Sequence, residues 1–166
     1  MLGALLDLGQ GPREQPTGRG RHGTVVIMRL DPEAARARLL DARVARLATV
    51  SGAGQPHTVP ITFALDGSTL FFVIDNKPKS TTDLRRLRDI RENPRVCVLV
   101  DHYSDDWDAL WWVRADGRAE IWEDERLRAA PVSLLALKYP QYQKQVPVGP
   151  VVAITVESLS GWSFTG

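Results

Sequence analysis

Along the chain the hydrophobic pattern switches between a period of two and a helical period, and each switch predicts an element. Residues 57–65 alternate apolar with polar or small side chains, as a strand with one buried face does. Residues 69–74 are continuously apolar and are predicted to form a strand buried on both faces. Residues 84–92 carry apolar side chains at helical spacing among arginines, and Asn93-Pro94 ends the predicted helix.

The other predicted elements follow from the same patterns. Asp31 is placed to cap a helix over residues 32–41, and a second helix is expected near residues 125–137. Most strands are consecutive, with the spacing of antiparallel pairs. We therefore expect a mainly β, α+β fold, a six-stranded antiparallel barrel with helices packed outside. The further strands are expected at residues 44–50, 95–100, 110–122 and 151–156.

Composition separates the first 27 residues from the rest. Residues 1–27 are interrupted by glycine and proline and should form a disordered N-terminal extension. Their apolar start lacks the basic lead-in and the length of a signal peptide. Residues 28–166 are long enough for one hydrophobic core, so they are predicted to form a single domain with Met28 as the functional start.

Charge is divided along a chain whose formal net charge is only +1. Residues 77–95 contain seven basic and three acidic side chains, whereas residues 101–125 contain nine acidic and two basic ones. The basic stretch suits a small anionic ligand better than a nucleic acid, which meets a wider basic surface. No apolar run is long enough to cross a membrane, and the single cysteine, Cys97, indicates a buried thiol in a reducing, cytoplasmic protein.

The segment 75–83 joins the apolar strand to the basic helix, and it is the strongest candidate site. Its hydroxyl residues are placed to cap the helix, with Ser80-x-x-Asp83 fitting a capping box. The free N–H groups of the first helical turn would then point into the space that two lysines reach, which suits a phosphate. Ordinary capping beside a solvated loop explains each residue equally well on its own. The residues concerned are Lys77, Lys79, Ser80, Thr81 and Thr82.

Familiar catalytic and metal-binding motifs are absent from the sequence, and its three histidines are too scattered to suggest a metal site. His57 is interpreted as a structural histidine, with contact to a ligand as the alternative. Pro60 cannot donate to a strand ladder, so it marks an edge or a bulge beside which a ligand could lie. Among Trp107, Trp111 and Trp112, one or two could stack on a flat ring, and core packing is the alternative.

Five motifs occur in a fixed order: Val-Ala-Arg-Leu-Ala-Thr-Val at 44–50, Gly-Gln-Pro-His-Thr-Val-Pro at 54–60, Asp-Asn-Lys-Pro-Lys-Ser-Thr at 75–81, Asn-Pro-Arg-Val at 93–96 and Asp-Asp-Trp-x-x-Leu-Trp-Trp-Val at 105–113. This ordered set resembles the pyridoxamine 5′-phosphate oxidase-like split β-barrel proteins, which use flavin or deazaflavin cofactors. The resemblance is greatest to the actinobacterial branch that uses the deazaflavin coenzyme F420. It covers about residues 30–164.

The resemblance implies a homodimer with two cofactor sites at the subunit interface. Pyridoxamine phosphate oxidases proper grip their substrate with an arginine-bearing C-terminal segment, whereas residues 161–166 carry no charged side chain. This departure argues against vitamin-forming activity. By the same resemblance, the phosphate and acidic tail of the cofactor would contact Lys77, Lys79, Ser80, Thr81 and Thr82, the strand along its ring would be Thr58, Val59 and Pro60, and Trp112 would be a wall of that pocket.

Three hypotheses for the function remain open. The first is an oxidoreductase in which F420 gives a hydride to an unsaturated organic substrate, because in such a protein the cofactor carries the reaction. The second keeps the fold and replaces F420 with FMN. The third is a non-catalytic carrier of F420 or flavin, since the sequence offers no evident acid or base. None of them involves nucleic acid, a membrane or a metal ion.

Overall fold

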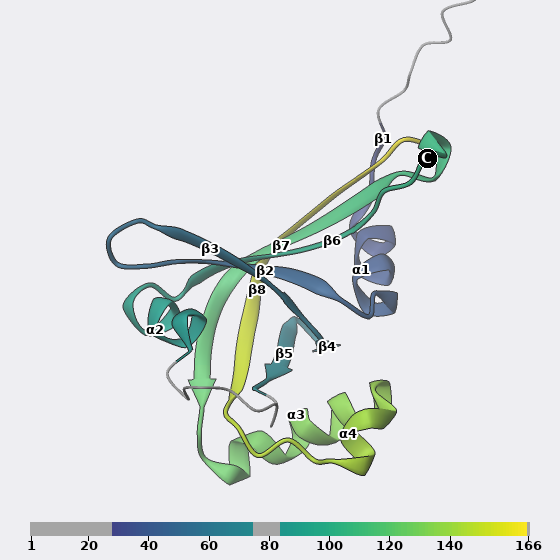
Figure 1. Ribbon diagram of the computed structural model, residues 1–166. Helices are drawn as coiled ribbons and strands as arrows, with labels where there is room; N and C mark the ends of the chain where they lie inside the picture. Colours follow the sequence, from purple (N-terminus) through teal and green to yellow (C-terminus); the bar gives the residue numbers. More distant parts are fainter. Residues whose placement is uncertain (1–27, 75–83, 166) are drawn as a thin grey trace, which may run out of the picture.

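The computed structural model describes residues 28–74 and 84–165, which contain eight strands, four α-helices and one 3-10 turn (Figure 1). The strands are β1 (Met28–Arg29), β2 (Ala45–Val50), β3 (Pro56–Ile61), β4 (Ala64–Asp66), β5 (Thr69–Val73), β6 (Arg95–His102), β7 (Trp111–Trp122) and β8 (Val151–Ser163). The helices are α1 (Pro32–Asp41), α2 (Arg85–Glu92), α3 (Glu125–Lys138) and α4 (Pro140–Lys144), and the 3-10 turn is η1 (Trp107–Ala109).

All the strands belong to one antiparallel sheet with the order β3-β2-β6-β7-β8-β5-β4, and β1 pairs with β8. The two end strands of this order, β3 and β4, are separated in sequence only by Thr62 and Phe63. The sheet must therefore curl until its two ends meet, which produces a barrel. The antiparallel α+β prediction is confirmed.

The predicted number of six strands is wrong, and the described residues contain eight. One added strand arises because the predicted strand 57–65 divides into β3 and β4, which lie at opposite ends of the sheet. The other is β1, which pairs in the register Met28 with Ser163 and Arg29 with Trp162. Alternation over 57–65 could not reveal the break, because a strand that changes partner keeps its period.

A buried tyrosine holds the point where the barrel closes. The hydroxyl of Tyr139 accepts a hydrogen bond from the Phe63 amide at 3.0 Å, and it lies 2.7 Å from the Phe63 carbonyl and 2.9 Å from the Arg43 carbonyl. Tyr139 is only 5% exposed. Because Phe63 sits between β3 and β4, its backbone groups bond to this side chain instead of to a neighbouring strand.

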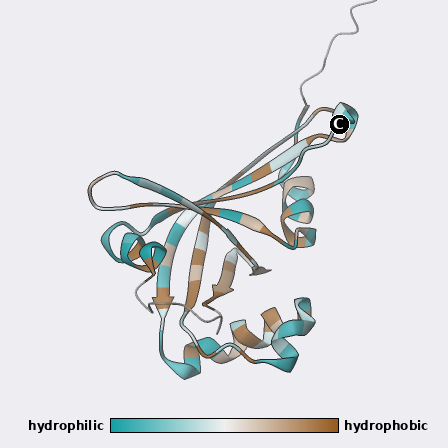
Figure 2. Ribbon diagram, viewed as in Figure 1, coloured by the Kyte–Doolittle hydropathy of each residue, from teal (hydrophilic) through white to brown (hydrophobic). Residues whose placement is uncertain are grey.

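The barrel interior is the main hydrophobic core. Strand residues such as Leu47, Val98 and Val113 are fully buried there. Leu39 of α1 and Ile90 of α2 belong to the same cluster, so both helices pack onto the barrel through apolar side chains. Alternating hydrophobic and hydrophilic bands along β6 and β7 are visible in Figure 2.

A second, smaller cluster lies on the outside of the barrel, under α3. It combines Phe71, Val151 and Ala153 of the sheet with Leu135 and Tyr139. Helix α3 thus covers the outer side of β5 and the first half of β8. The outer side of β2, β3, β6 and the middle of β7 has no such cover among the described residues. We call this uncovered side the outer face.

The predicted helices agree well with the structure. Helix α1 spans Pro32–Asp41 as predicted, and the Asp31 carboxylate accepts from the Ala34 amide at 2.8 Å. Helix α3 forms in spite of an internal proline, Pro131. The last strand was predicted to end at residue 156 but continues to Ser163. Its second half pairs with β7 in an arm that projects from the barrel (Figure 1).

Candidate functional site

The predicted cofactor strand is β3, and its side chains divide between two faces. Thr58 and Pro60 are exposed on the outer face, whereas Val59 packs against the core. Among the described residues β2 is the only strand that pairs with β3. Alternate N–H and C=O groups of β3 therefore point away from the sheet and are open to a ligand.

Residues in register across the outer face place Thr58 at one end of a row. Thr58 pairs with Ala48, Ala48 with Cys97, and Cys97 with Asp116, so the four side chains point to the same side. A cavity of about 330 Å³ opens on this face, and Ala48, Cys97 and Asp116 line it. The outer face therefore offers both an open strand edge and a hollow one strand away from Thr58.

The thiol in this hollow is chemically quiet at neutral pH. Burial, and then the neighbouring Asp116 carboxylate, raise the pKa of Cys97 from 9.0 to about 11. A thiol is a nucleophile only as the thiolate, so Cys97 is not placed to attack a substrate. It forms part of the floor of the cavity.

The three tryptophans that were candidates for ring stacking have separate positions. Trp111 packs against the barrel core, and the Arg38 guanidinium lies 5.0 Å from the centre of its ring. Trp112 lies near the start of β7, opposite Asp101 and Trp162, on the same side of the sheet as the outer face. Trp107 is 66% exposed and lies in η1.

Trp112 shares a face with Pro60 but not a pocket within one chain. Pro60 lies in β3 and Trp112 in β7, three strands along the sheet order. At about 4.8 Å per strand this separation is roughly 14 Å. Pro60 and Trp112 are therefore not neighbours within one chain.

The predicted anion site, Lys77, Lys79, Ser80, Thr81 and Thr82, lies outside the described residues. The two ends that flank it are described: β5 stops at Val73, and α2 starts at Arg85 with Leu84 as its N-cap. Leu84 makes no capping hydrogen bond with its side chain, and the predicted capping by hydroxyl residues at 80–82, with its capping box, lies outside the described residues. The hydrophobic pattern could not fix this boundary, because helix ends are decided by local backbone geometry.

No prediction covered a buried carboxylate on α2. Asp89 is 3% exposed and accepts a hydrogen bond from the Thr49 hydroxyl at 2.7 Å. Its Oδ2 also lies 3.6 Å from Nδ1 of His57 and 3.9 Å from Nε of Arg85. Asp89 is not on the stripe formed by the apolar side chains of the helix, so the hydrophobic pattern carried no signal for its burial.

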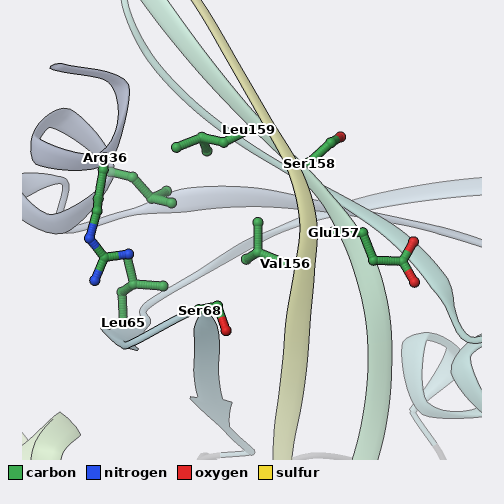
Figure 3. Close-up of a pocket in the computed structure, with 8 residues that line it drawn as sticks. Arg36, Leu65, Ser68, Val156, Glu157, Ser158 and Leu159 are labelled. Atoms are coloured by element: carbon green, nitrogen blue, oxygen red, sulfur yellow. The ribbon is translucent and has the colours of Figure 1, made fainter. Parts of the chain in front are cut away.

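A second cavity, of about 230 Å³, lies between α1 and β8 (Figure 3). Leu39, Leu65 and Val156 form its apolar lining, and Arg36 lies at its edge, where its guanidinium donates to the Gly67 carbonyl at 2.6 Å. No predicted site residue lines this cavity.

No group of three histidine, cysteine, aspartate or glutamate side chains in residues 28–74 and 84–165 is arranged to hold a metal ion. In the same part of the chain, no helix has the length and apolar character needed to cross a membrane.

Comparison with protein families assigns the chain to one of them. The family profile described as pyridoxamine 5′-phosphate oxidase matches residues 31–163, which include every element from α1 to β8. The chain belongs to the pyridoxamine 5′-phosphate oxidase family. No curated protein matches it.

Solved structures of similar shape agree with this family and its split-barrel fold. An FAD-binding protein from Mesorhizobium loti is 25% identical, with a TM-score of 0.64, and the match covers 82% of this chain and 97% of that protein. A conserved hypothetical protein from Mycobacterium tuberculosis is 20% identical, with a TM-score of 0.66 and coverage of 81% and 86%.

The haem storage protein HutZ from Vibrio cholerae has the same fold, at 20% identity, with a TM-score of 0.61 and coverage of 80% and 94%. Proteins described by different ligands thus share this barrel. Membership of the pyridoxamine 5′-phosphate oxidase family consequently determines the fold but not the cofactor, which depends on the residues of the binding site.

Proposed function

We propose that this family member is an oxidoreductase that binds coenzyme F420 on the outer face and uses it to reduce an unsaturated organic substrate. The observation that carries the proposal is the open edge of β3 next to the outer-face cavity, in a chain that matches the family from residue 31 to residue 163. When bound, the deazaflavin supplies the hydride chemistry.

The described residues fit a flat ring with hydrogen-bonding edges. Backbone N–H and C=O groups on the free edge of β3 match the donors and acceptors of such a ring, and Thr58 adds a hydroxyl beside them. Pro60 is exposed in the same strand and contributes an apolar contact without a donor. Strand β3 would thus orient the ring, with Val59 anchoring the strand to the core.

The charged tail of the cofactor is assigned to the segment between β5 and α2. We propose that Lys77 and Lys79 contact its phosphate and acidic groups, because ammonium groups form charge-assisted hydrogen bonds with such anions. We assign further contacts to the neighbouring hydroxyl residues, Ser80, Thr81 and Thr82.

We further propose a homodimer in which the outer faces of two copies meet. Within one chain, β3 and Trp112 are about 14 Å apart, at about 4.8 Å per strand. This separation supports a dimer, because Trp112 of the same chain is too far from β3 to contact a ring bound there. A second copy would bring its Trp112 to the ring that lies on the first. The exposed outer face has no covering helix among the described residues, which leaves it free for a partner.

The cofactor is tested by spectroscopy. Purified protein is titrated with F420, FMN and FAD, and binding is followed by the fluorescence of each. We expect the tightest binding with F420. The description of the Mesorhizobium loti protein as FAD-binding makes flavin the competing candidate. If the protein binds a flavin tightly and does not bind F420, the cofactor is the flavin and the F420 proposal is wrong.

Catalysis is tested separately from binding. Reduced F420 is incubated with the protein and a panel of enones, quinones and tetrapyrroles, and its reoxidation is followed by absorbance. We expect turnover with at least one class of substrate. Tight binding without any turnover would instead support the non-catalytic carrier.

The tail site is tested by a double substitution. Lys77→Ala with Lys79→Ala should weaken cofactor binding by roughly 2–4 kcal/mol, since each lysine is assigned a charge-assisted contact. The control with the same loss of charge is Arg126→Ala with Lys144→Ala, two exposed residues of α3 and α4. If the two double variants bind the cofactor with equal affinity, Lys77 and Lys79 do not contact its charged tail.

A further inference from the structure

Helix α2 is attached to the β2–β3 hairpin through two of its carboxylates. The Asp89 carboxylate accepts a hydrogen bond of 2.7 Å from the hydroxyl of Thr49 in β2. The Glu92 carboxylate accepts one of 2.7 Å from the amide of Gly52, in the turn between β2 and β3. These two contacts differ in burial, because the first is buried and the second is exposed.

A carboxylate at 3% exposure is costly unless hydrogen bonds and positive charge compensate it. Thr49 supplies one strong hydrogen bond. Arg85, at 3.9 Å and itself half exposed, supplies a weak ionic contact. Among the described residues, Thr49 is thus the one hydrogen-bond donor to the Asp89 carboxylate, and the carboxylate can accept a further bond.

His57 is the side chain placed to be this further donor, but its Nδ1 is too far from Asp89 to form the hydrogen bond. Its Nδ1 is buried and makes no hydrogen bond, although it lies 3.6 Å from Oδ2 of Asp89. This distance is several tenths of an ångström beyond a normal hydrogen bond. A small shift of β3 towards α2 would shorten this distance, giving the buried Nδ1 a partner and Asp89 a second hydrogen bond.

His57 is in the right place to couple this contact to a ligand. It precedes Thr58 in β3 and pairs with Thr49 across the hairpin. Successive side chains of a strand point to opposite faces, so His57 faces α2 while Thr58 faces outward. A ligand that pressed on the outer side of β3 would therefore act on the distance between His57 and Asp89.

We propose that Asp89 and His57 are positioning residues for the cofactor ring: a ligand seated against Thr58 pushes β3 towards α2 and closes the Nδ1–Oδ2 hydrogen bond. The inference rests on the proposed function, because it takes β3 as the strand along the ring. The hydrogen-bonded His57–Asp89 pair then fixes the distance between β3 and α2. Neither side chain touches the reacting atoms.

The first test is spectroscopic and uses the three histidines of the chain, His22, His57 and His102. Protein labelled with ¹⁵N-histidine is titrated with whichever of FMN and F420 the wild type binds. We expect the His57 ring-nitrogen signals to shift and a protected Nδ1–H proton to appear on binding. Assignment comes from His57→Gln, and Asp89→Asn should abolish the new proton signal.

The second test is affinity, with matched variants. Thr49→Val and Asp89→Asn should each weaken binding of the same cofactor at least tenfold, whereas Thr49→Ser, which keeps the hydroxyl, should restore it to within about twofold. Glu92→Gln makes the same carboxylate-to-amide change on the same helix, but at the turn, and should leave affinity unchanged. Circular dichroism melts verify that each variant is folded.

The outcomes separate the two proposals. Wild-type protein that binds cofactor while the His57 signals stay fixed overturns the positioning role and leaves the proposed function standing. The same holds if folded Asp89→Asn binds as tightly as wild type. Wild-type protein that binds neither FMN nor F420 overturns both.

Discussion

Cys97 shows how burial and a charged neighbour together set the chemistry of a side chain. Its strand is apolar, yet its thiol faces the outer-face cavity beside Asp116. Burial and that carboxylate raise the pKa of Cys97 to about 11. Between pH 9 and pH 11 the unfolded chain therefore loses the thiol proton while the folded chain keeps it, so this group makes the free energy of unfolding fall as pH rises.

The reactivity of Cys97 should follow the same range. We expect alkylation by iodoacetamide to be slow at pH 8 and to rise with a midpoint near pH 11, because only the thiolate reacts. Asp116→Asn should move the midpoint downwards but not fully to 9.0, since burial is the larger cause. A midpoint near 9 in the folded wild-type protein would contradict this explanation.

Tyr139 is the residue on which closure of the barrel depends. Tyr139→Phe leaves the buried Phe63 amide without its hydrogen-bond acceptor, and it removes the hydroxyl beside the Phe63 and Arg43 carbonyls. We expect a loss of about 1–3 kcal/mol in the free energy of unfolding, measured by urea denaturation. The control is Tyr103→Phe, at a tyrosine that is 65% exposed, which should change nothing.

At the scale of elements, β7 and β8 form the longest pairing of the sheet, and their close approach depends on a glycine. The register shifts between Asp116 and Gly117, opposite Ser158 and Val156. A Cβ at Gly117 would lie 2.3 Å from the Thr155 carbonyl oxygen, which is backbone and cannot move away. This position is therefore closed to any side chain.

Gly117→Ala should accordingly separate the two strands locally and cost about 1–3 kcal/mol of stability, as overpacking does. Gly67→Asn is the comparison, because Gly67 has φ +55° with open space around it, and asparagine adopts that conformation readily. Thermal melts of the two variants give the measurement. Similar melting temperatures would mean that β7 and β8 can move apart at little cost.

The elements also differ in how well their sequence predicts them. Helix α1 follows from its capping residue and proline, both local signals. The division between β3 and β4 does not, because it depends on the Tyr139 side chain reaching Phe63 from 76 residues away. Burial of Asp89 likewise depends on Thr49 and His57, which come from another part of the chain.

At the scale of the whole molecule, the proposed dimer predicts the effect of a charge at the centre of the outer face. Ala48 lies in the row between Thr58 and Cys97. Ala48→Glu should dissociate the dimer and weaken cofactor binding, because an unpaired carboxylate would be buried between the copies. Analytical ultracentrifugation and a cofactor titration measure the two effects.

The matched control is Ala37→Glu on the exposed side of α1, which should remain dimeric. If Ala48→Glu stays dimeric and binds cofactor normally, the two copies do not meet through the outer face. The proposal that Trp112 of a second copy contacts the ring bound to the first would then be wrong as well.

Removal of residues 1–27 is predicted to leave folding and cofactor affinity unchanged. The core and the proposed site are assigned to residues after Met28, and residues 1–27 are rich in glycine and proline. A thermal melt and a titration of the shortened chain provide the check. A marked drop in either would give these residues a part in the domain.

The sequence by itself determined the strand and helix pattern, the antiparallel α+β class and the resemblance to the family, because periodicity, capping and ordered motifs are local properties. The tertiary structure alone decided where strand 57–65 breaks, which side of β3 is open, how far Trp112 lies from it, and that Asp89 is buried beside His57. Each of these depends on residues that are distant in sequence, and only folding fixes their distances.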